Sequence, residues 1–499
     1  MDKISIKLSL VILALVMLFS SAAKAQDDLE KGIDAVKKGD YVTAVNFLSN
    51  AVKAKQNYES FYYYGEALYR TGSIQQAEEY LKKALKEDDE GIEALMSLGR
   101  IYSKQKKYDE ADGLFKKGLK VEPENINLMI AQADNYSEAG KIDDAIKVLT
   151  LATTISKENP KVYVGLGDAY LIRGSYKLSL DYYKKALAIN SNVPTAYFGI
   201  GSVYFRQRKY NEALVGFDNA LLKDPKFAQA YLEKGKILYF GGKYGDAVLA
   251  FNEFTKLMPG SQEGNSYFAK TLYKQGEIYM GKGQTDQAKE KFDEALTILN
   301  DVLVKDPVSI TGNLFTAYIY SARGDLNESG KEENYYKAID YFKKVEIKNY
   351  EIEDLLKLGK LYVNLKNYSE SYPIYEKAAL KDSLDAEVYS EWGKAIFKNE
   401  KYEEAIPKFS RAIDLGDDDT YTELYKGLCL YALKKYDEAV PCFKNSITID
   451  PKLLISREFL ARAYKFGGKA EDAVKAYEDV LLLDPENQEA KDAVKALKK

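Results

Sequence analysis

The stretch PTAYFGIGSVYFRQRKYNEALVGFDNALLKDP, residues 194–225, contains the pattern that decides the fold. Its apolar residues recur at the spacing of amphipathic helices that bury one face. Two small residues, Gly201 and Ala213, stand where two such helices can approach closely, and Phe217 can fill the space beside them. Pro225 lacks a backbone N–H and ends the second helix. The stretch therefore predicts a hairpin of two helices.

This hairpin pattern repeats with a fixed period. The first small position falls every 34 residues, at Gly65, Gly99, Ala133, Gly167, Gly201 and Gly235. A second small residue follows 12 positions later, at Ala77, Ala111, Ala145, Ser179, Ala213 and Ala247. A period of this length is typical of solenoids, in which each hairpin buries its apolar face against its neighbours.

The order of aromatic, small and proline positions resembles the tetratricopeptide repeat, here with Tyr197, Ile200, Gly201, Tyr204, Ala213, Phe217, Ala220 and Pro225. The resemblance, to family members of exported bacterial type, implies an all-α, right-handed superhelical solenoid. We expect about 13 hairpins, opening near residues 25, 58, 92, 126, 160, 194, 228, 269, 310, 352, 386, 420 and 454. Residues 488–499 are expected to form a capping helix that covers the last open face.

The period is disturbed in the middle of the chain. Residues 26–261 form a regular array of about seven repeats and residues 352–487 one of about four, with irregular units over residues 262–351. We expect about seven extra residues to lengthen the junction near residues 261–268, residues 296–305 to extend a second helix, and residues 325–334 to form a polar loop. A continuous solenoid with one irregular joint is favoured over two separate stacks.

The first 25 residues have the features of a secretory signal. Lys3 and Lys7 precede an apolar run from Leu8 to Phe19, and Ala23-Lys24-Ala25 fits the cleavage pattern. Retention of the run as a membrane anchor is the alternative, but the run is shorter than a bilayer span requires. We expect an exported protein, periplasmic or secreted, with only indirect membrane association.

The composition argues against catalysis and against nucleic-acid binding. The chain has no His, which excludes His-dependent triads and His metal sites. Its 72 basic and 76 acidic residues give a net charge of −4, without a basic run. We therefore predict no enzyme activity, cofactor or metal. Cys429 and Cys442 could form a disulfide or serve as small apolar side chains, the alternative that we favour.

Binding surfaces should lie on the first helix of each hairpin, because the resemblance implies that these helices line the concave wall. Aromatic and cationic residues at or beside the inward positions suit peptides or glycans. The candidates are Tyr62, Tyr69, Phe198, Phe205, Arg206, Lys236, Tyr239, Tyr273, Lys274, Phe315 and Tyr318, with Lys360, Lys394, Phe397 and Tyr431 also at such positions. As an alternative, part of this set is core.

Two functions are compatible with these features. The first is a non-enzymatic scaffold of the cell envelope that holds components of a secretion or outer-membrane assembly complex. The second is a module that binds peptides or glycans along an aromatic groove. The Lys and Asn pairs with which some family members grip a C-terminal carboxylate are not reproduced in the N-terminal repeats, where Glu66, Arg100 and Asp168 stand instead.

Overall fold

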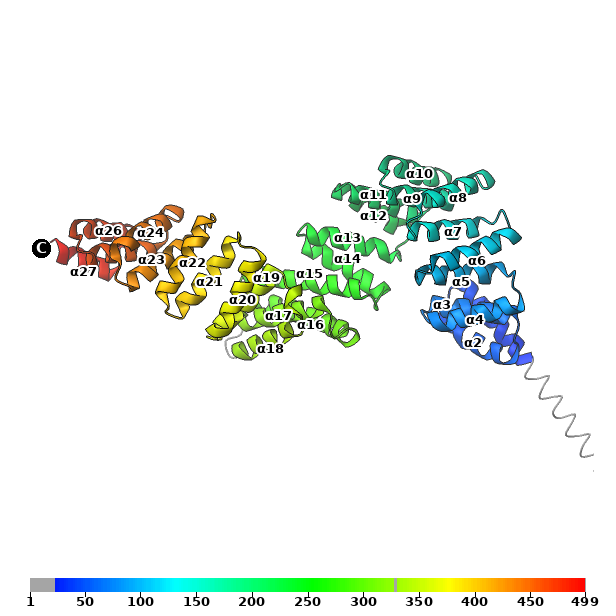
Figure 1. Ribbon diagram of the computed structural model, residues 1–499, viewed down its shortest axis with the longest axis horizontal. Coiled ribbons are helices and arrows are strands. Elements are labelled where there is room, and N and C mark those ends of the chain that lie inside the picture. Colours follow the sequence, from blue (N-terminus) through cyan, green and yellow to red (C-terminus); the bar gives the residue numbers. More distant parts are fainter. Residues whose placement is uncertain (1–22, 327–329, 499) are drawn as a thin grey trace, which may run out of the picture. The chain divides into compact units, whose positions relative to one another are not determined.

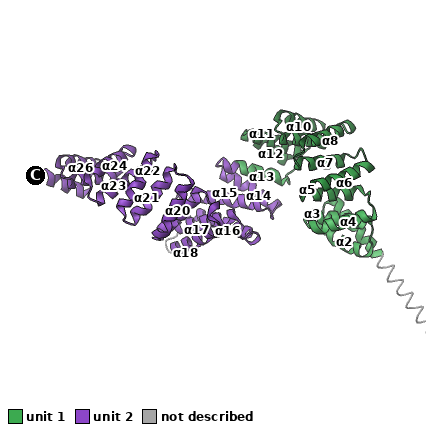
Figure 2. Cartoon of the chain, viewed as in Figure 1, with its two compact units in different colours: residues 1–237 green, residues 238–499 purple. Residues whose placement is uncertain are grey.

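The computed structural model describes residues 23–326 and 330–498, and every regular element within these ranges is a helix (Figure 1). The chain divides into two compact units, residues 1–237 and residues 238–499 (Figure 2). The division falls within one helix, whereas the sequence places the irregular region from residue 262 onwards. The expected all-helical repeat architecture is confirmed.

Unit 1 is a series of helix hairpins of nearly constant length. Its first hairpin pairs helical residues 23–38 with α2. The remaining helices are α2 (Tyr41–Ala54), α3 (Tyr58–Arg70), α4 (Ile74–Glu87), α5 (Ile92–Lys104), α6 (Tyr108–Val121), α7 (Ile126–Glu138), α8 (Ile142–Ile155), α9 (Pro160–Ile172), α10 (Tyr176–Ile189), α11 (Pro194–Arg206), α12 (Tyr210–Lys223) and α13 (Ala228–Phe240), which crosses into unit 2.

Unit 2 contains the longer helices as well as further regular hairpins. Its helices are α14 (Tyr244–Leu257), α15 (Gln262–Gly281), α16 (Thr285–Lys305), α17 (Ile310–Leu326), α18 (Lys331–Lys343), the short η2 (Ile347–Asn349), α19 (Ile352–Asn364), α20 (Tyr368–Lys381), α21 (Ala386–Lys398), α22 (Tyr402–Asp414), α23 (Thr420–Ala432), α24 (Tyr436–Ile449), α25 (Leu454–Phe466), α26 (Ala470–Leu483) and α27 (Gln488–Leu497). The predicted capping helix is α27, and its inner face carries the buried side chains of Ala490 and Ala493.

In most hairpins an aromatic ring of the second helix packs on the small residue of the first, and in others a leucine does, as Leu81 does beside Gly65. A Cβ atom added to Gly201 would lie 2.8 Å from Phe217, a ring that is only 1% exposed. Tyr375 fills the same position beside Gly359, and Phe409 beside Gly393. Burial of one such ring contributes roughly 1.5–3 kcal/mol. The small residues of the period are therefore packing positions.

The turn between the two helices also repeats. Its second residue has a positive φ in most hairpins, as at Gly140 with φ 75° and Gly174 with φ 82°. Glycine adopts this conformation without steric cost. At five of these turns the residue is not glycine but Lys106, Arg208, Lys366, Glu400 or Lys434.

Two expectations about the irregular region are wrong. The seven extra residues near residue 261 do not lengthen a junction but extend α15, which begins at Gln262 under an N-cap from Ser261. The predicted polar loop of residues 325–334 is helical at both ends, since α17 continues to Leu326 and α18 begins at Lys331, whereas its residues 327–329 lie outside the described residues. Acidic Glu332 and Glu333 occupy the first turn of α18, where they favour a helix start. The predicted extension of a second helix through Lys305 is confirmed in α16.

Three further features bear on the sequence predictions. The signal sequence lies, apart from residues 23–25, outside the described residues, so its cleavage stays a prediction. Within the described ranges, helices long and apolar enough to cross a membrane are absent. Cys429 and Cys442 are buried free thiols, and burial raises their pKa values to about 12 and about 11. The two side chains therefore act as small apolar groups in this structure.

Candidate functional site

The first helices of successive hairpins contact one another and form a wall in each unit. In unit 1 the wall consists of α3, α5, α7, α9 and α11, and in unit 2 of α15, α17, α19, α21 and α23. In both walls, the residue that follows each small residue is one of the positions that the sequence predicts to point inward. We refer to these surfaces as the unit 1 wall and the unit 2 wall.

The unit 1 wall carries a row of charged residues with the repeat period. Glu66 accepts hydrogen bonds from Arg70 Nε and Ser97 Oγ, both at 2.7 Å. Asp134 and Asp168 follow further along the wall. Each side chain is accessible to solvent, but the side chains of the wall surround it on the other sides. This enclosure raises the pKa of each carboxyl to about 6, against the opposing effects of Arg100 on Asp134 and of a Tyr183 hydrogen bond on Asp168. Three of the four residues in this row, all but Arg100, are therefore acidic.

The predicted aromatic residues of unit 1 do not form one continuous surface. Tyr62 is half-buried against Tyr58 and Tyr63, and Phe198 packs on Phe217 and Phe227. Tyr69 lies under the ammonium group of Lys104, whereas Phe205 lies at the hairpin turn with its ring 6.0 Å from Tyr210. Among the predicted cations, Arg206 is exposed and Lys236 pairs with Glu233 at 3.0 Å.

In unit 2 the predicted residues do come together. Tyr273 on α15 packs against Phe315 and Tyr318 on α17, with ring centroids 5.6 and 5.7 Å away. Tyr239 packs against Tyr267, with ring centroids 6.0 Å apart, and the ammonium group of Lys270 lies between Tyr267 and Phe315 of this group. Tyr273 and Tyr318 are only 2% and 6% exposed, so the alternative interpretation as core applies to these two rings. Tyr239 and Phe315 remain half-exposed.

Carboxylates and lysines cover this aromatic group. Glu277 accepts hydrogen bonds from Tyr273 Oη at 2.5 Å and from Lys274 Nζ at 2.8 Å. Lys357 on α19 approaches Glu277 to 3.9 Å and also lies 4.9 Å above the Tyr318 ring. The Tyr318 hydroxyl donates to Asp354, which is almost fully buried. Three first helices are thus connected by side chains on one wall.

Further along the unit 2 wall there is a hollow of about 150 Å³ between α19, α21 and α23. Its residues alternate between cationic, aromatic and amide side chains. The lining comprises Lys360, Val363, Asn364, Tyr375, Glu391, Lys394, Ala395, Phe397, Lys398 and Tyr425. Of these, Lys360, Lys394 and Phe397 occupy positions that the sequence predicts to point inward.

The hollow has an excess of positive charge. Glu391 pairs with both Lys394, at 3.2 Å, and Lys360, at 3.4 Å. Burial lowers the pKa of Lys394, but Glu391 and Asp419 outweigh it and the net pKa is raised, so the ammonium group stays charged. Lys398 is exposed and forms no ion pair with the described residues. The hollow therefore suits an anionic or hydrogen-bonding group on a partner.

Sequence reasoning missed several of these residues. Lys270, Lys357, Asn364, Lys398 and Tyr425 are not among its candidates, although Lys398 lies one helical turn after Lys394. That spacing places both lysines on the same helix face and could have identified Lys398. The involvement of Lys357 depends on contact between α15 and α19, which no local pattern indicates.

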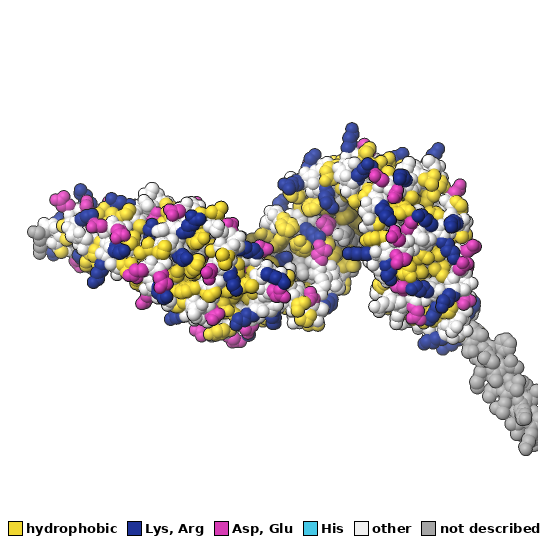
Figure 3. Space-filling model, in the orientation of Figure 1, with side chains coloured by type: hydrophobic (Ala, Val, Ile, Leu, Met, Phe, Trp, Pro, Cys, Tyr) yellow, Lys and Arg dark blue, Asp and Glu magenta, His cyan; other side chains and the backbone are white. Residues whose placement is uncertain are grey.

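The chemistry of the site is that of binding. Within the described ranges, groups of His, Cys, Asp and Glu that could hold a metal ion are absent. The two kinds of charge are interspersed over the visible face of each unit (Figure 3), which does not fit a nucleic-acid surface.

The fold and the period define a repeat protein built from helix hairpins. Family models described as the tetratricopeptide repeat match residues 167–208, 198–261, 270–298, 356–420, 421–453 and 456–487. A model described as subunit 3 of the anaphase-promoting complex, or cyclosome, matches residues 37–118. The chain belongs to the tetratricopeptide-repeat family. Repeats of this family form interaction scaffolds that bind protein partners.

The solved structures that are similar to this chain include the following three. A tetratricopeptide-repeat protein of Parabacteroides merdae is 19% identical, with a TM-score of 0.43 over 50% of this chain and 99% of its own. The Cut9–Hcn1 hetero-tetramer of the APC/C is 15% identical, with a TM-score of 0.39 over 94% and 95%. The pilF protein of Pseudomonas aeruginosa is 21% identical, with a TM-score of 0.32 over 43% and 97%. Among curated proteins, none matches the sequence.

Proposed function

We propose that this protein is a scaffold of the cell envelope that binds a polypeptide partner along the unit 2 wall and holds it within a secretion or outer-membrane assembly complex. The N-terminal sequence pattern supports export. The hollow between α19, α21 and α23 is the single observation that carries the binding proposal, because it combines lysines, an amide and aromatic rings on first helices.

The side chains of the hollow fit a peptide better than a glycan. Sugars bind to open ring faces, but Phe397 packs against Tyr402 and Tyr425, and Tyr425 is stacked on Phe409. What the hollow offers instead is a set of hydrogen-bond donors. Lysine ammonium groups and the Asn364 amide can meet the carbonyl and carboxylate oxygens of a peptide.

Affinity purification from native envelope tests this proposal. The bait is the tagged full-length protein, and the test variant carries Lys394→Gln and Lys398→Gln. The matched control carries Lys282→Gln and Lys305→Gln, which remove the same charge from exposed positions at the ends of α15 and α16. We expect wild type and control to recover the same protein in stoichiometric amount and the test variant to lose it, with unchanged far-ultraviolet circular dichroism.

Two results would contradict the proposal in different ways. If wild type recovers no stoichiometric protein from repeated preparations, the scaffold role is wrong. If the test variant recovers the partner as well as the control does, the scaffold role stands but the hollow is not the binding site.

A further inference from the structure

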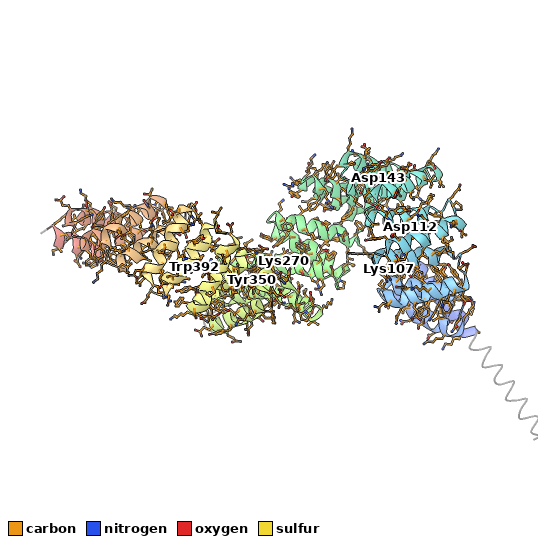
Figure 4. The ribbon with its side chains drawn as sticks, in the orientation of Figure 1. Lys107, Asp112, Asp143, Lys270, Tyr350 and Trp392 are labelled. Atoms are coloured by element: carbon orange, nitrogen blue, oxygen red, sulfur yellow. The ribbon has the colours of Figure 1, made fainter. Side chains whose placement is uncertain are left out.

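Lys270, like the exposed Lys398, is a lysine of the unit 2 wall without an ion pair to the described residues, but its ammonium group lies between two aromatic rings. Lys274, Lys357, Lys360 and Lys394 pair with carboxylates, at 2.8 to 3.9 Å. Lys270 lies on α15, one turn before Lys274 (Figure 4), and its ammonium group has neither an ion pair nor a hydrogen bond with the described residues. It is a cation without a counter-charge.

The surroundings of Lys270 are aromatic. Its Nζ lies 5.4 Å from the ring centroid of Tyr267 and 5.2 Å from that of Phe315 on α17. The side chain is half-buried, and burial lowers its pKa with no nearby carboxylate to oppose the effect. Contact with two rings recovers part of the solvation that the ammonium group loses, but the three N–H donors stay without a protein acceptor.

The two flanking rings are themselves fixed. Tyr267 is stacked on Phe251, with ring centroids 5.8 Å apart, and Phe315 is held by Tyr273 and Tyr318. Because these contacts exist without a partner, the position of the ammonium group between the rings is preorganised. Binding of an anion there would cost little additional side-chain order.

We propose that Lys270 receives a carboxylate of the bound polypeptide, while Tyr267 and Phe315 pack against apolar groups beside that carboxylate. The inference rests on the proposed function, since it names the chemistry of the partner on the same wall. The partner segment would be an extended acidic stretch with apolar neighbours. Its carboxylate could belong to an Asp or Glu side chain or to the chain terminus, and the Lys270 site recognises the chemistry that both share.

Fluorescence anisotropy with three short labelled peptides tests the proposal. The first alternates aspartate with phenylalanine and has an amidated C-terminus, so its carboxylates are side chains. In the second, asparagine replaces aspartate and the C-terminus is free, so its carboxylate is terminal. The third has asparagine and an amidated end. Each is titrated with the full-length wild type, with Lys270→Met, with Lys270→Arg and with the control Lys305→Met.

We expect wild type, Lys270→Arg and Lys305→Met to bind either the first or the second peptide with similar affinity. Lys270→Met should bind the same peptide at least about tenfold more weakly. The difference between wild type and Lys270→Met should shrink as salt is added. The peptide that binds identifies the source of the carboxylate. The third peptide should bind neither wild type nor Lys270→Met measurably.

Three outcomes overturn the inference: equal binding by Lys270→Met and Lys305→Met, equal binding of the third peptide, or no binding of either carboxylate peptide to wild type. None of them decides the proposed function, because recovery of a partner from native envelope is measured separately. Conversely, peptide binding through Lys270 would stand even if the Lys394→Gln and Lys398→Gln variant retained its partner.

Discussion

In unit 1 the residues that follow the small residues of the first helices include Glu66, Arg100, Asp134 and Asp168, whereas in unit 2 they include Glu277, Tyr318, Lys360 and Lys394. The two walls have the same architecture but different side-chain chemistry. In unit 1, Asp134 and Asp168 are open to solvent and form no ion pair with the described residues. In unit 2, Lys357 of α19 lies 3.9 Å from Glu277 of α15, and Asp354 of α19 accepts a hydrogen bond from Tyr318 of α17.

This difference follows from the length of the helices. Regular hairpins consist of one helix of 13 residues and one of 14, such as α11 and α12, and they repeat the same spacing between first helices. The 20-residue α15 and the 17-residue α17 break that spacing, and Glu277 on α15 comes within ion-pair distance of Lys357 on α19. Close backbone packing thus dominates in the regular repeats, and a side-chain network is added where the period fails.

The largest predicted effect concerns the close packing of unit 1. A Cβ atom on Gly216 would lie 2.5 Å from the Cα atom of Gly201, so the backbones of α11 and α12 would have to separate. We expect Gly216→Val to destabilise unit 1 by about 3 kcal/mol. In a urea titration, far-ultraviolet circular dichroism should show an early transition, while the fluorescence of Trp392, the single Trp of the chain, follows unit 2 and stays unchanged.

Gly113→Ala is the matched control for that experiment. Gly113 lies within α6, and a Cβ atom there would have nothing within 4 Å. Because alanine favours the helix, we expect a gain of up to about 1 kcal/mol. Equal urea midpoints for the two variants would show that backbone contact does not limit unit 1.

The second prediction concerns the side-chain network of unit 2. Tyr318→Phe removes the donor to Asp354, a residue that is 3% exposed and would keep only the Glu351 N–H, at 2.6 Å. An under-satisfied buried carboxylate should cost about 2 kcal/mol. We expect the Trp392 transition to move to lower urea. The control is Tyr336→Phe, since that ring is 57% exposed, and a shift of equal size in the control would rule out the network as the cause.

Local sequence signals were sufficient for the fold and for part of the site. The period, the small residues and the turn signals fixed the hairpin starts from residue 58 to residue 228 and from residue 310 to residue 454, all of which the structure confirms. The start of α15 was also readable, because Ser261 follows Pro259 and Gly260 and caps the helix. The expected junction there is wrong because it rests on the spacing of the small residues and not on this capping residue.

The site depended on contacts that sequence spacing does not contain. The sequence spacing selects aromatic residues on the first helices, but the burial of Tyr273 and Tyr318 arises from the packing of α15 on α17. Likewise, Lys270 is distinctive because its unpaired ammonium group lies between Tyr267 and Phe315, and Phe315 lies on another helix. The helix period therefore predicts on which face of a helix a residue lies. The contacts of that residue with other helices can be identified only from the tertiary structure.

The third prediction compares turns of the two units. Lys366 in unit 2 adopts a φ of 57°, a conformation that costs about 1 kcal/mol for a residue with a Cβ atom. Lys366→Gly should stabilise unit 2 by about 0.5 kcal/mol, less than the full cost because glycine also gains entropy in the unfolded chain. Gly140→Ala should destabilise unit 1 by about 1 kcal/mol because its φ of 75° is unfavourable for a residue with a Cβ atom. The added Cβ would have nothing within 4 Å, so the φ alone accounts for the effect. Urea midpoints measured by fluorescence and circular dichroism check both, and loss of stability in Lys366→Gly would contradict the strain at that turn.

The smallest predicted effect concerns the open carboxylates of the unit 1 wall. The folded-state pKa of Asp134, about 6, lies above its ordinary value of 3.8, so the unfolded chain releases the proton first as the pH rises. Unit 1 should therefore lose stability between about pH 4 and pH 6. Asp134→Asn removes this loss and should stabilise unit 1 at pH 7, by less than about 1 kcal/mol because the carboxylate is exposed and screened. Urea midpoints of the circular dichroism transition at several pH values measure the slope. Asp168 has a shift of the same sign, so the slope should be reduced rather than abolished, and a slope identical to that of wild type would mean that enclosure by the wall does not affect Asp134.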